Sequence, residues 1–127
     1  MKLGQEEFEK IVAEALDELS DNIRKHLNNV VIRVDDLPSE EQLRKTGYSD
    51  GYILFGLFEG YAQARRLNFG PVLPDRITLF RRPLLQSCSS EKDCRDRIRA
   101  VLRHEIAHHF GLDEKGARRA ESRTKRK

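Results

Sequence analysis

The order of helical and strand patterns along the chain predicts an α+β fold, in which a small mixed sheet packs against two long helices. Two observations support this class. Apolar residues recur with helical spacing near both ends of the chain, over residues 5–27 and over roughly 90–110. Three short apolar runs lie between these helical patterns, and the 127 residues fit a single domain with a modest core.

The first helix is predicted over residues 5–27, because apolar side chains recur there at steps of three and four and acids crowd the first turn. These apolar side chains are Phe8, Val12, Leu16, Leu19, Ile23 and Leu27. Asn28 and Asn29 then end the helix. His26 lies close to that end and is interpreted as a surface residue at a helix terminus, where a cation is mildly favoured.

Three runs rich in β-branched and aromatic residues predict strands over residues 30–34, 52–58 and 77–80. The polar stretch 38–51 predicts a loop, and Pro83 is expected to close the third strand. If the third strand lies at the edge of the sheet, it would be able to hold an extended peptide as an added strand.

The last long helix is predicted to begin near Ser90, whose hydroxyl would cap it with Asp93 three residues on. Its apolar face consists of Ile98, Val101, Leu102, Ile106 and Phe110. Gly111 is well suited to end this helix in a left-handed conformation. A second short helix is expected from about residue 114 to 121.

The composition predicts a soluble cytosolic protein, since 38% of the residues are apolar and 35% are charged. No apolar run is long enough to span a bilayer, and the first residues lack the apolar core of a secretory signal. In that compartment Cys88 and Cys94 are expected to be reduced thiols. The absence of tryptophan and the 7% aromatic content argue against an aromatic stacking platform for single-stranded nucleic acid, and we expect no nucleic acid partner.

The C-terminal residues are strongly basic, because residues 115–127 hold seven Lys or Arg and the single acid Glu121. This segment has a net charge of +6, which leaves −3 for the rest of the chain. It lacks the apolar residues needed to fold alone. We therefore expect one domain over residues 1–121 and a disordered basic tail over residues 122–127.

The block His104-Glu105-Ile106-Ala107-His108 fits the pattern H-E-x-x-H inside the last predicted helix. Side chains four residues apart share one face of a helix, so both imidazoles would converge on one ion. Neutral imidazole nitrogens suit zinc. Glu105 is displaced around the axis, where it would reach a metal-bound water as a general base. The pattern therefore predicts a catalytic zinc site.

A third protein ligand is expected shortly after the second histidine. Gly111 would let the chain turn back towards the metal, and Glu114 then has the spacing of a ligand. Asp113 would serve if the turn is tighter, and Glu121 is a more distant option. Three protein ligands would leave the fourth position open for water. His109 points roughly 100° away from its neighbour His108, which favours a supporting role over metal binding.

The segment HEIAHHFGLDE at 104–114, with GLFEG at 56–60 and PDRITLFRRPLLQ at 74–86, resembles the small bacterial zincin-like metallopeptidase family. The resemblance spans residues 5–121 and implies a minimal zincin fold, with a small sheet on the active-site helix. It implies His104 and His108 as zinc ligands, Glu105 as the catalytic glutamate, and Glu114 or Asp113 as the acidic third ligand. The segment is also similar to the metzincins, although their Met-turn is missing because the only methionine is Met1.

The sequence therefore predicts a zinc-dependent peptidase acting on a peptide or protein substrate. Zinc would lower the pKa of its bound water, and Glu105 would take the proton and pass it to the leaving amine. Candidates for an oxyanion-stabilising group, by chemistry alone, are Tyr48, Tyr52 and Tyr61.

Two alternatives stay open. A metal-dependent endoribonuclease would use the spacing H-x-x-x-H-x5 with Glu114 last, and the basic tail would contact phosphates. A non-catalytic adaptor would use zinc for folding, although structural sites usually have four protein ligands and rely on cysteine.

Overall fold

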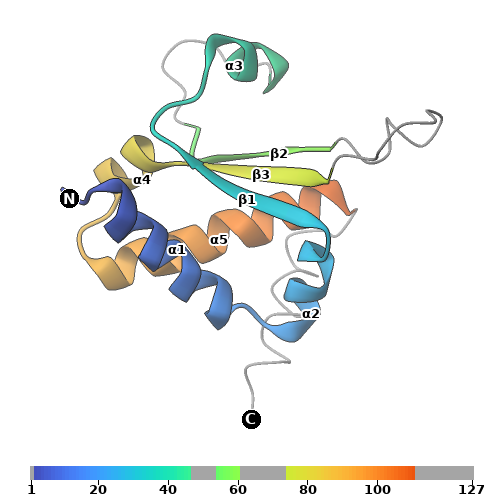
Figure 1. Ribbon diagram of the computed structural model, residues 1–127, viewed down its shortest axis with the longest axis horizontal. Helices are drawn as coiled ribbons and strands as arrows, with labels where there is room; N and C mark the ends of the chain where they lie inside the picture. Colours follow the sequence, from blue (N-terminus) through green and yellow to red (C-terminus); the bar gives the residue numbers. More distant parts are fainter. Residues whose placement is uncertain (1, 47–53, 61–73, 111–127) are drawn as a thin grey trace.

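The computed structural model describes residues 2–46, 54–60 and 74–110. Over these residues the chain forms a three-stranded sheet with helices on both of its sides, which confirms the predicted α+β class (Figure 1). The elements in chain order are α1 (Gln5–Glu18), α2 (Asp21–Arg24), the 3₁₀ helix η1 (Lys25–Leu27), β1 (Val30–Asp35), α3 (Glu40–Thr46), β2 (Gly56–Glu59), β3 (Asp75–Phe80), α4 (Arg81–Ser87) and α5 (Glu91–His109). Helices α1 and α5 lie under one face of the sheet, and α3 lies on the other side (Figure 1).

The sheet is mixed and has the strand order β1-β3-β2. Strand β1 pairs with β3 in parallel, with Ile32 opposite Ile77, and β2 pairs with β3 antiparallel, with Phe58 opposite Ile77. Strand β3 therefore has a neighbour on each side. The suggestion that this third strand could hold an extended peptide at the sheet edge is wrong, since an added strand needs a free edge.

The N-terminal helical pattern is divided into three pieces, so the prediction of one helix over residues 5–27 is wrong. The backbone is extended at Leu19 and Ser20. The Ser20 hydroxyl accepts a hydrogen bond from the backbone N–H of Ile23 at 3.2 Å and so starts a new helix. The apolar spacing continued through the break because Leu19 and Ile23 are both buried in the same core.

Two short helices were not predicted. In α3, Ser39 and Gln42 form a reciprocal capping box, with Gln42 N–H to Ser39 Oγ at 3.1 Å and Ser39 N–H to Gln42 Oε1 at 2.9 Å. None of the residues of α3 is buried, and the helix has no apolar pattern by which the sequence could reveal it. The prediction of a loop over 38–51 is therefore wrong for Glu40–Thr46. In α4, Pro83 lies in the first turn, where its missing N–H costs nothing, instead of ending the element.

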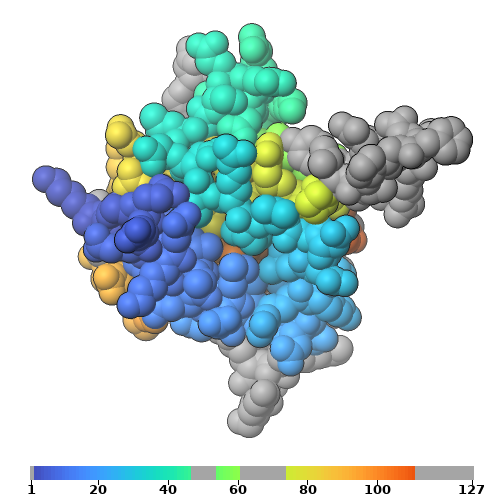
Figure 2. All heavy atoms as spheres, in the orientation of Figure 1, coloured from blue at the N-terminus to red at the C-terminus, as the bar shows by residue number. Residues whose placement is uncertain are grey.

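The core joins α5 to α1 and to the underside of the sheet. Along α5 the buried side chains are Cys94, Ile98, Leu102, Ile106 and Ala107, and α1 contributes Phe8, Ile11, Val12 and Ala15. At the rim of this contact Arg99 donates to Glu18 at 3.1 Å. Side chains of α1 and β1 meet over the core and hide most of α5 in the space-filling view (Figure 2). The position of α5 is thus set by burial along most of its length.

Helix α5 begins as predicted. Ser90 is its N-cap, and its hydroxyl accepts from the N–H of Asp93 at 3.0 Å. The Asp93 carboxylate accepts in turn from the N–H of Ser89 at 2.9 Å, which is a capping box displaced by one residue. The helix runs to His109, and Phe110 is its C-cap. Gly111, the short helix expected over 114–121 and the basic tail lie outside the described residues.

No helix among the described residues is long and apolar enough to cross a membrane. Cys88 and Cys94 are both free and buried, near the junction of α4 and α5. Burial raises the pKa of the Cys94 thiol to about 12, and a hydrogen bond with Cys88 acts in the same direction.

The Ser90 cap gives a stability prediction. Replacing Ser90 with Ala should lower the free energy of unfolding by about 1 kcal/mol, because the N–H of Asp93 loses its acceptor at the start of the helix on which the core depends. Urea denaturation of the two proteins measures this difference. The matched control is Ser39→Ala, which removes the cap of α3, a helix with no buried residue. Equal effects of the two substitutions would contradict the importance assigned to α5.

Candidate active site

The H-E-x-x-H residues occupy the last two turns of α5. His104 and His108 are four residues apart and both are exposed, so their imidazoles lie on one solvent-facing side of the helix. Glu105 follows His104 by one residue, which turns it roughly 100° around the axis towards the buried side. The helix thus presents two imidazoles outwards and one carboxylate beside them.

The carboxylate of Glu105 is held between α5 and β2. It is partly buried and accepts a hydrogen bond from the backbone N–H of Phe58. Burial raises the pKa of Glu105, although the nearby imidazoles of His104 and His108 and the Phe58 N–H act in the opposite direction. A carboxyl group with a raised pKa is closer to the working range of a general base at neutral pH.

Strand β2 is the part of the sheet that borders this end of α5. It forms an edge of the described sheet and packs against α5. A hollow of about 250 Å³ runs along it, lined by Lys45, Thr46, Leu57, Phe58, Glu59 and Gly60. Phe58 therefore contributes both to this hollow and to the hydrogen bond with Glu105.

Glu59 fastens the β2 edge to its neighbours. Its carboxylate accepts from Arg76 of β3 at 2.9 Å and from Gln42 of α3 at 3.3 Å, and the ammonium of Lys45 lies 3.6 Å away. Burial acts to raise the pKa of Glu59, but these hydrogen bonds and charges outweigh it and the pKa is lowered. The ionised carboxylate thus ties together β2, β3 and α3 beside the candidate site.

His109 lies against the sheet, apart from the outward-facing imidazoles. Its ring stacks on that of Phe58, with centroids 3.7 Å apart and an angle of 19° between the planes. Its Nε2 lies 3.9 Å from Oδ2 of Asp75, at the start of β3. His109 thus contacts both β2 and β3, and its role as a supporting residue stays a prediction.

His26 differs from its interpretation as a simple surface residue. Its ring lies 4.7 Å from that of Phe110, the C-cap of α5, so η1 contacts the end of α5. Burial, followed by the charge of Lys25, lowers the pKa of His26. This contact has no local signature in the sequence, because the two residues are far apart in the chain.

The described residues supply two of the metal donors that the sequence predicts. No group of three His, Cys, Asp or Glu able to hold a metal occurs among residues 2–46, 54–60 and 74–110. The candidate third ligands Glu114, Asp113 and Glu121 lie outside those ranges, as do Tyr48, Tyr52 and Tyr61. Two exposed imidazoles on one helix face, next to a partly buried carboxylate, fit zinc by the chemistry of the donors.

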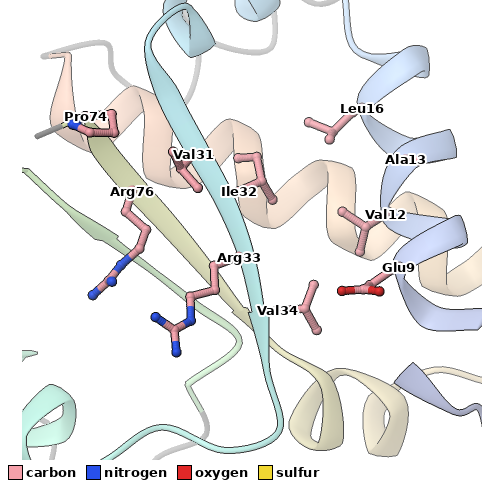
Figure 3. Close-up of a pocket in the computed structure, with 10 residues that line it drawn as sticks. All are labelled: Glu9, Val12, Ala13, Leu16, Val31, Ile32, Arg33, Val34, Pro74 and Arg76. Atoms are coloured by element: carbon pink, nitrogen blue, oxygen red, sulfur yellow. The ribbon is translucent and has the colours of Figure 1, made fainter. Parts of the chain in front are cut away.

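A larger groove, of about 800 Å³, lies elsewhere. It runs between α1 and β1, with Val12 and Leu16 on one side and the strand residues 31–34 on the other (Figure 3). Since the strand order is β1-β3-β2, this groove is at the opposite edge of the sheet from Phe58 and Glu105. It is thus separate from the H-E-x-x-H residues.

Comparison with known families agrees with this architecture. The model of the zincin-like metallopeptidase family matches residues 27–123, a span that includes all three strands and the whole of α5. The chain therefore belongs to the zincin-like metallopeptidase family. No curated protein matches the chain at a significant level.

Two contacts between the β2 edge and the candidate site were missed by sequence reasoning. The backbone N–H of Phe58 holds Glu105, and the ring of Phe58 holds His109. The segment GLFEG at 56–60 was singled out for its resemblance to the family, but a backbone donor has no residue-type signature. Only the packing of β2 on α5 reveals it.

The raised pKa of Glu105 gives a pH-dependent prediction for the metal-free protein. The neutral carboxyl of Glu105 makes its full contribution to the free energy of unfolding when the pH is below 4.5, the ordinary pKa of a glutamate. This contribution is lost as the pH rises through the raised pKa of the folded protein. Glu105→Gln keeps a neutral side chain at every pH. The melting temperature of this variant should therefore match that of the wild type near pH 4 and exceed it near pH 8.

Thermal unfolding by circular dichroism, in the presence of a chelator, measures the two melting temperatures across this range. Glu9→Gln, at an exposed position of α1, is the matched control and should show no such divergence. A wild type that gains stability relative to Glu105→Gln with rising pH would contradict the burial of an ionising carboxylate at this position.

Proposed function

We propose that this chain is a zinc-dependent metallopeptidase, in which Glu105 acts as the general base for hydrolysis of a peptide bond. The observation that carries the proposal is the placement of Glu105: a partly buried carboxylate with a raised pKa, held by a strand edge, beside two exposed imidazoles one turn apart. Membership in the zincin-like metallopeptidase family supports the same reaction class.

The metal would be held by His104 and His108, with Glu114 or Asp113 as the third protein ligand. When bound, zinc lowers the pKa of water towards about 7 and polarises a carbonyl group. The two imidazoles need only turn towards a common point in solvent, because both already lie on one face of the helix. An acidic third donor would leave one position for substrate and water.

Glu105 would move the proton. Its carboxylate would accept a proton from the attacking water and pass it to the nitrogen of the leaving amine. Burial supports both steps, because a raised pKa lets the same group hold the proton briefly near neutral pH. The N–H of Phe58 would keep one oxygen of the carboxylate in place, which leaves the other for the water.

The substrate would bind along β2. This strand is an edge of the sheet and packs on α5, and an extended peptide would add to it through main-chain hydrogen bonds. The hollow beside Leu57 and Glu59 would receive side chains of that peptide. Strand β2 therefore replaces β3, which is central, as the proposed platform for a peptide or protein substrate.

The position of Glu105 also favours peptide hydrolysis over the endoribonuclease alternative. The spacing of that alternative makes no use of a residue at position 105, whereas here this carboxylate is held by Phe58. The partly buried carboxylate beside the histidines likewise has no role in a purely structural zinc site. We propose the cytosol as the place of action, where the free thiols Cys88 and Cys94 would remain reduced.

The direct test compares zinc content and peptide hydrolysis in three variants. Glu105→Gln should bind zinc like the wild type and lose about 10²- to 10⁴-fold in kcat, because proton transfer is removed while the ligands remain. His104→Ala should lose both zinc and activity. Glu9→Gln, remote on α1, should change neither.

Zinc is measured by elemental analysis after gel filtration, and cleavage by mass spectrometry of an unbiased peptide library. Undiminished turnover by Glu105→Gln would contradict the proposed mechanism. Cleavage that survives the loss of zinc in His104→Ala would show that the activity belongs to another site.

A further inference from the structure

We propose that His109 is a positioning residue, whose ring, stacked on Phe58, holds the last turn of α5 against β2 and thereby fixes the directions of Glu105 and His108. The inference rests on the proposed function, since it concerns the site where zinc would bind. It assigns a role to a residue beside the metal-binding motif that is itself neither metal ligand nor base.

The first observation is the closeness of the stack. The rings of His109 and Phe58 are nearly parallel and only 3.7 Å apart at their centroids. Phe110 then meets both rings edge-on, with centroids 6.2 Å from Phe58 and 5.0 Å from His109. The two edge-on pairs of Phe110 have a geometry that is favourable beyond the area they bury. The closer stack of His109 on Phe58 covers one face of each ring. The end of α5 is therefore fastened to β2 by a group of three rings.

The second observation is that α5 contacts Phe58 twice. Glu105 accepts the backbone N–H of Phe58, and His109 covers its ring. Glu105 and His109 are four residues apart, so they lie one above the other on the same side of the helix. One residue of the strand is thus bound by two successive turns of α5, which fixes both the rotation and the height of the helix relative to β2.

The rotation matters because the motif uses two neighbouring faces of the helix. Glu105 and His109 lie on the side that meets β2, while His104 and His108 lie roughly 80–100° around the axis and are exposed. His108 belongs to the last turn, and helix termini fray when nothing holds them. Without the stack, the last turn would lose the contact that keeps His108 in line with His104.

The ring of His109 also lies close to Gly60 of the β2 edge and to Asp75 of β3. A Cβ atom added to Gly60 would lie 3.0 Å from Cε1 of His109, so this glycine lets the strand pass close to the ring. Asp75 Oδ2, at the start of β3, lies 3.9 Å from Nε2 of the ring. Strands β2 and β3 therefore both contact the imidazole, and its stacked face is turned to Phe58 instead of to the metal-binding side.

The experiment measures zinc affinity by competition with a chromophoric chelator, which needs no substrate. His109→Ala and Phe58→Leu should each weaken zinc binding about 10- to 100-fold, the usual effect of removing a group that orients a ligand. The double variant should be little weaker than either single one, because both remove the same contact. His109→Phe keeps a stacked ring and should restore affinity to within a few-fold of the wild type.

Three further variants separate positioning from simple stability. His109→Gln keeps polarity without a ring and should bind zinc as weakly as the alanine variant. Gly60→Ala leaves both rings in the chain but crowds His109, and should give an intermediate loss. Glu9→Gln is the control, since this exposed residue of α1 is not part of the three-ring group, and it should bind zinc normally. Affinities are compared well below the melting temperature of each variant.

Each outcome decides between the proposals. If the wild type binds zinc and His109→Ala binds it equally well, positioning by His109 is overturned while the proposed function stands. If His109→Phe is as weak as His109→Ala, the imidazole acts chemically and the stacking role is wrong. If the wild type binds no zinc at these residues, the proposed function fails and the inference fails with it.

Discussion

The apolar contact between α5 and the underside of the sheet is the constraint on which the rest of the structure depends. Ile98, Leu102 and Ile106 are fully buried along this helix. Only the residues on the remaining sides of α5 can therefore contact a metal or a substrate. Because burial fixes which side faces the core, it also fixes which side faces solvent. Glu105 falls at the boundary, where it is partly buried next to β2, and the two histidines of the motif fall outside it.

The same contact explains why β2, a strand of four residues, is important in the proposed function. It has little pairing of its own beyond β3, so side chains hold it in place: Glu59 through Arg76 and Gln42, and Phe58 through Glu105 and His109. A short edge strand fixed in this way would offer its free side to a peptide without shifting against the helix. The packing of β2 on α5 thus determines both the raised pKa of Glu105 and the direction in which the edge of β2 faces.

The sequence was sufficient to predict the fold class and the start of α5 at Ser90, because helical spacing and a capping serine act locally. It was insufficient where tertiary contacts decide. The break at Ser20 kept the apolar spacing intact, and α3 has no apolar face to reveal it. The strand order could not be predicted from the sequence either. Strand β3 is the last of the three in the chain but pairs with both others, and such long-range pairing has no local signature. At the site, the spacing of His104, Glu105 and His108 was readable, whereas the backbone donor Phe58 was not.

The central claim is that zinc binds at the end of α5 with two imidazoles and one acidic ligand from the following segment. Anomalous diffraction at the zinc edge from crystals of the zinc-loaded protein tests it most directly. We expect one strong peak within coordination distance of His104 and His108, with a carboxylate of Glu114 or Asp113 as third ligand and Glu105 outside direct contact. A peak coordinated by four protein side chains, or no peak at this helix, would contradict it.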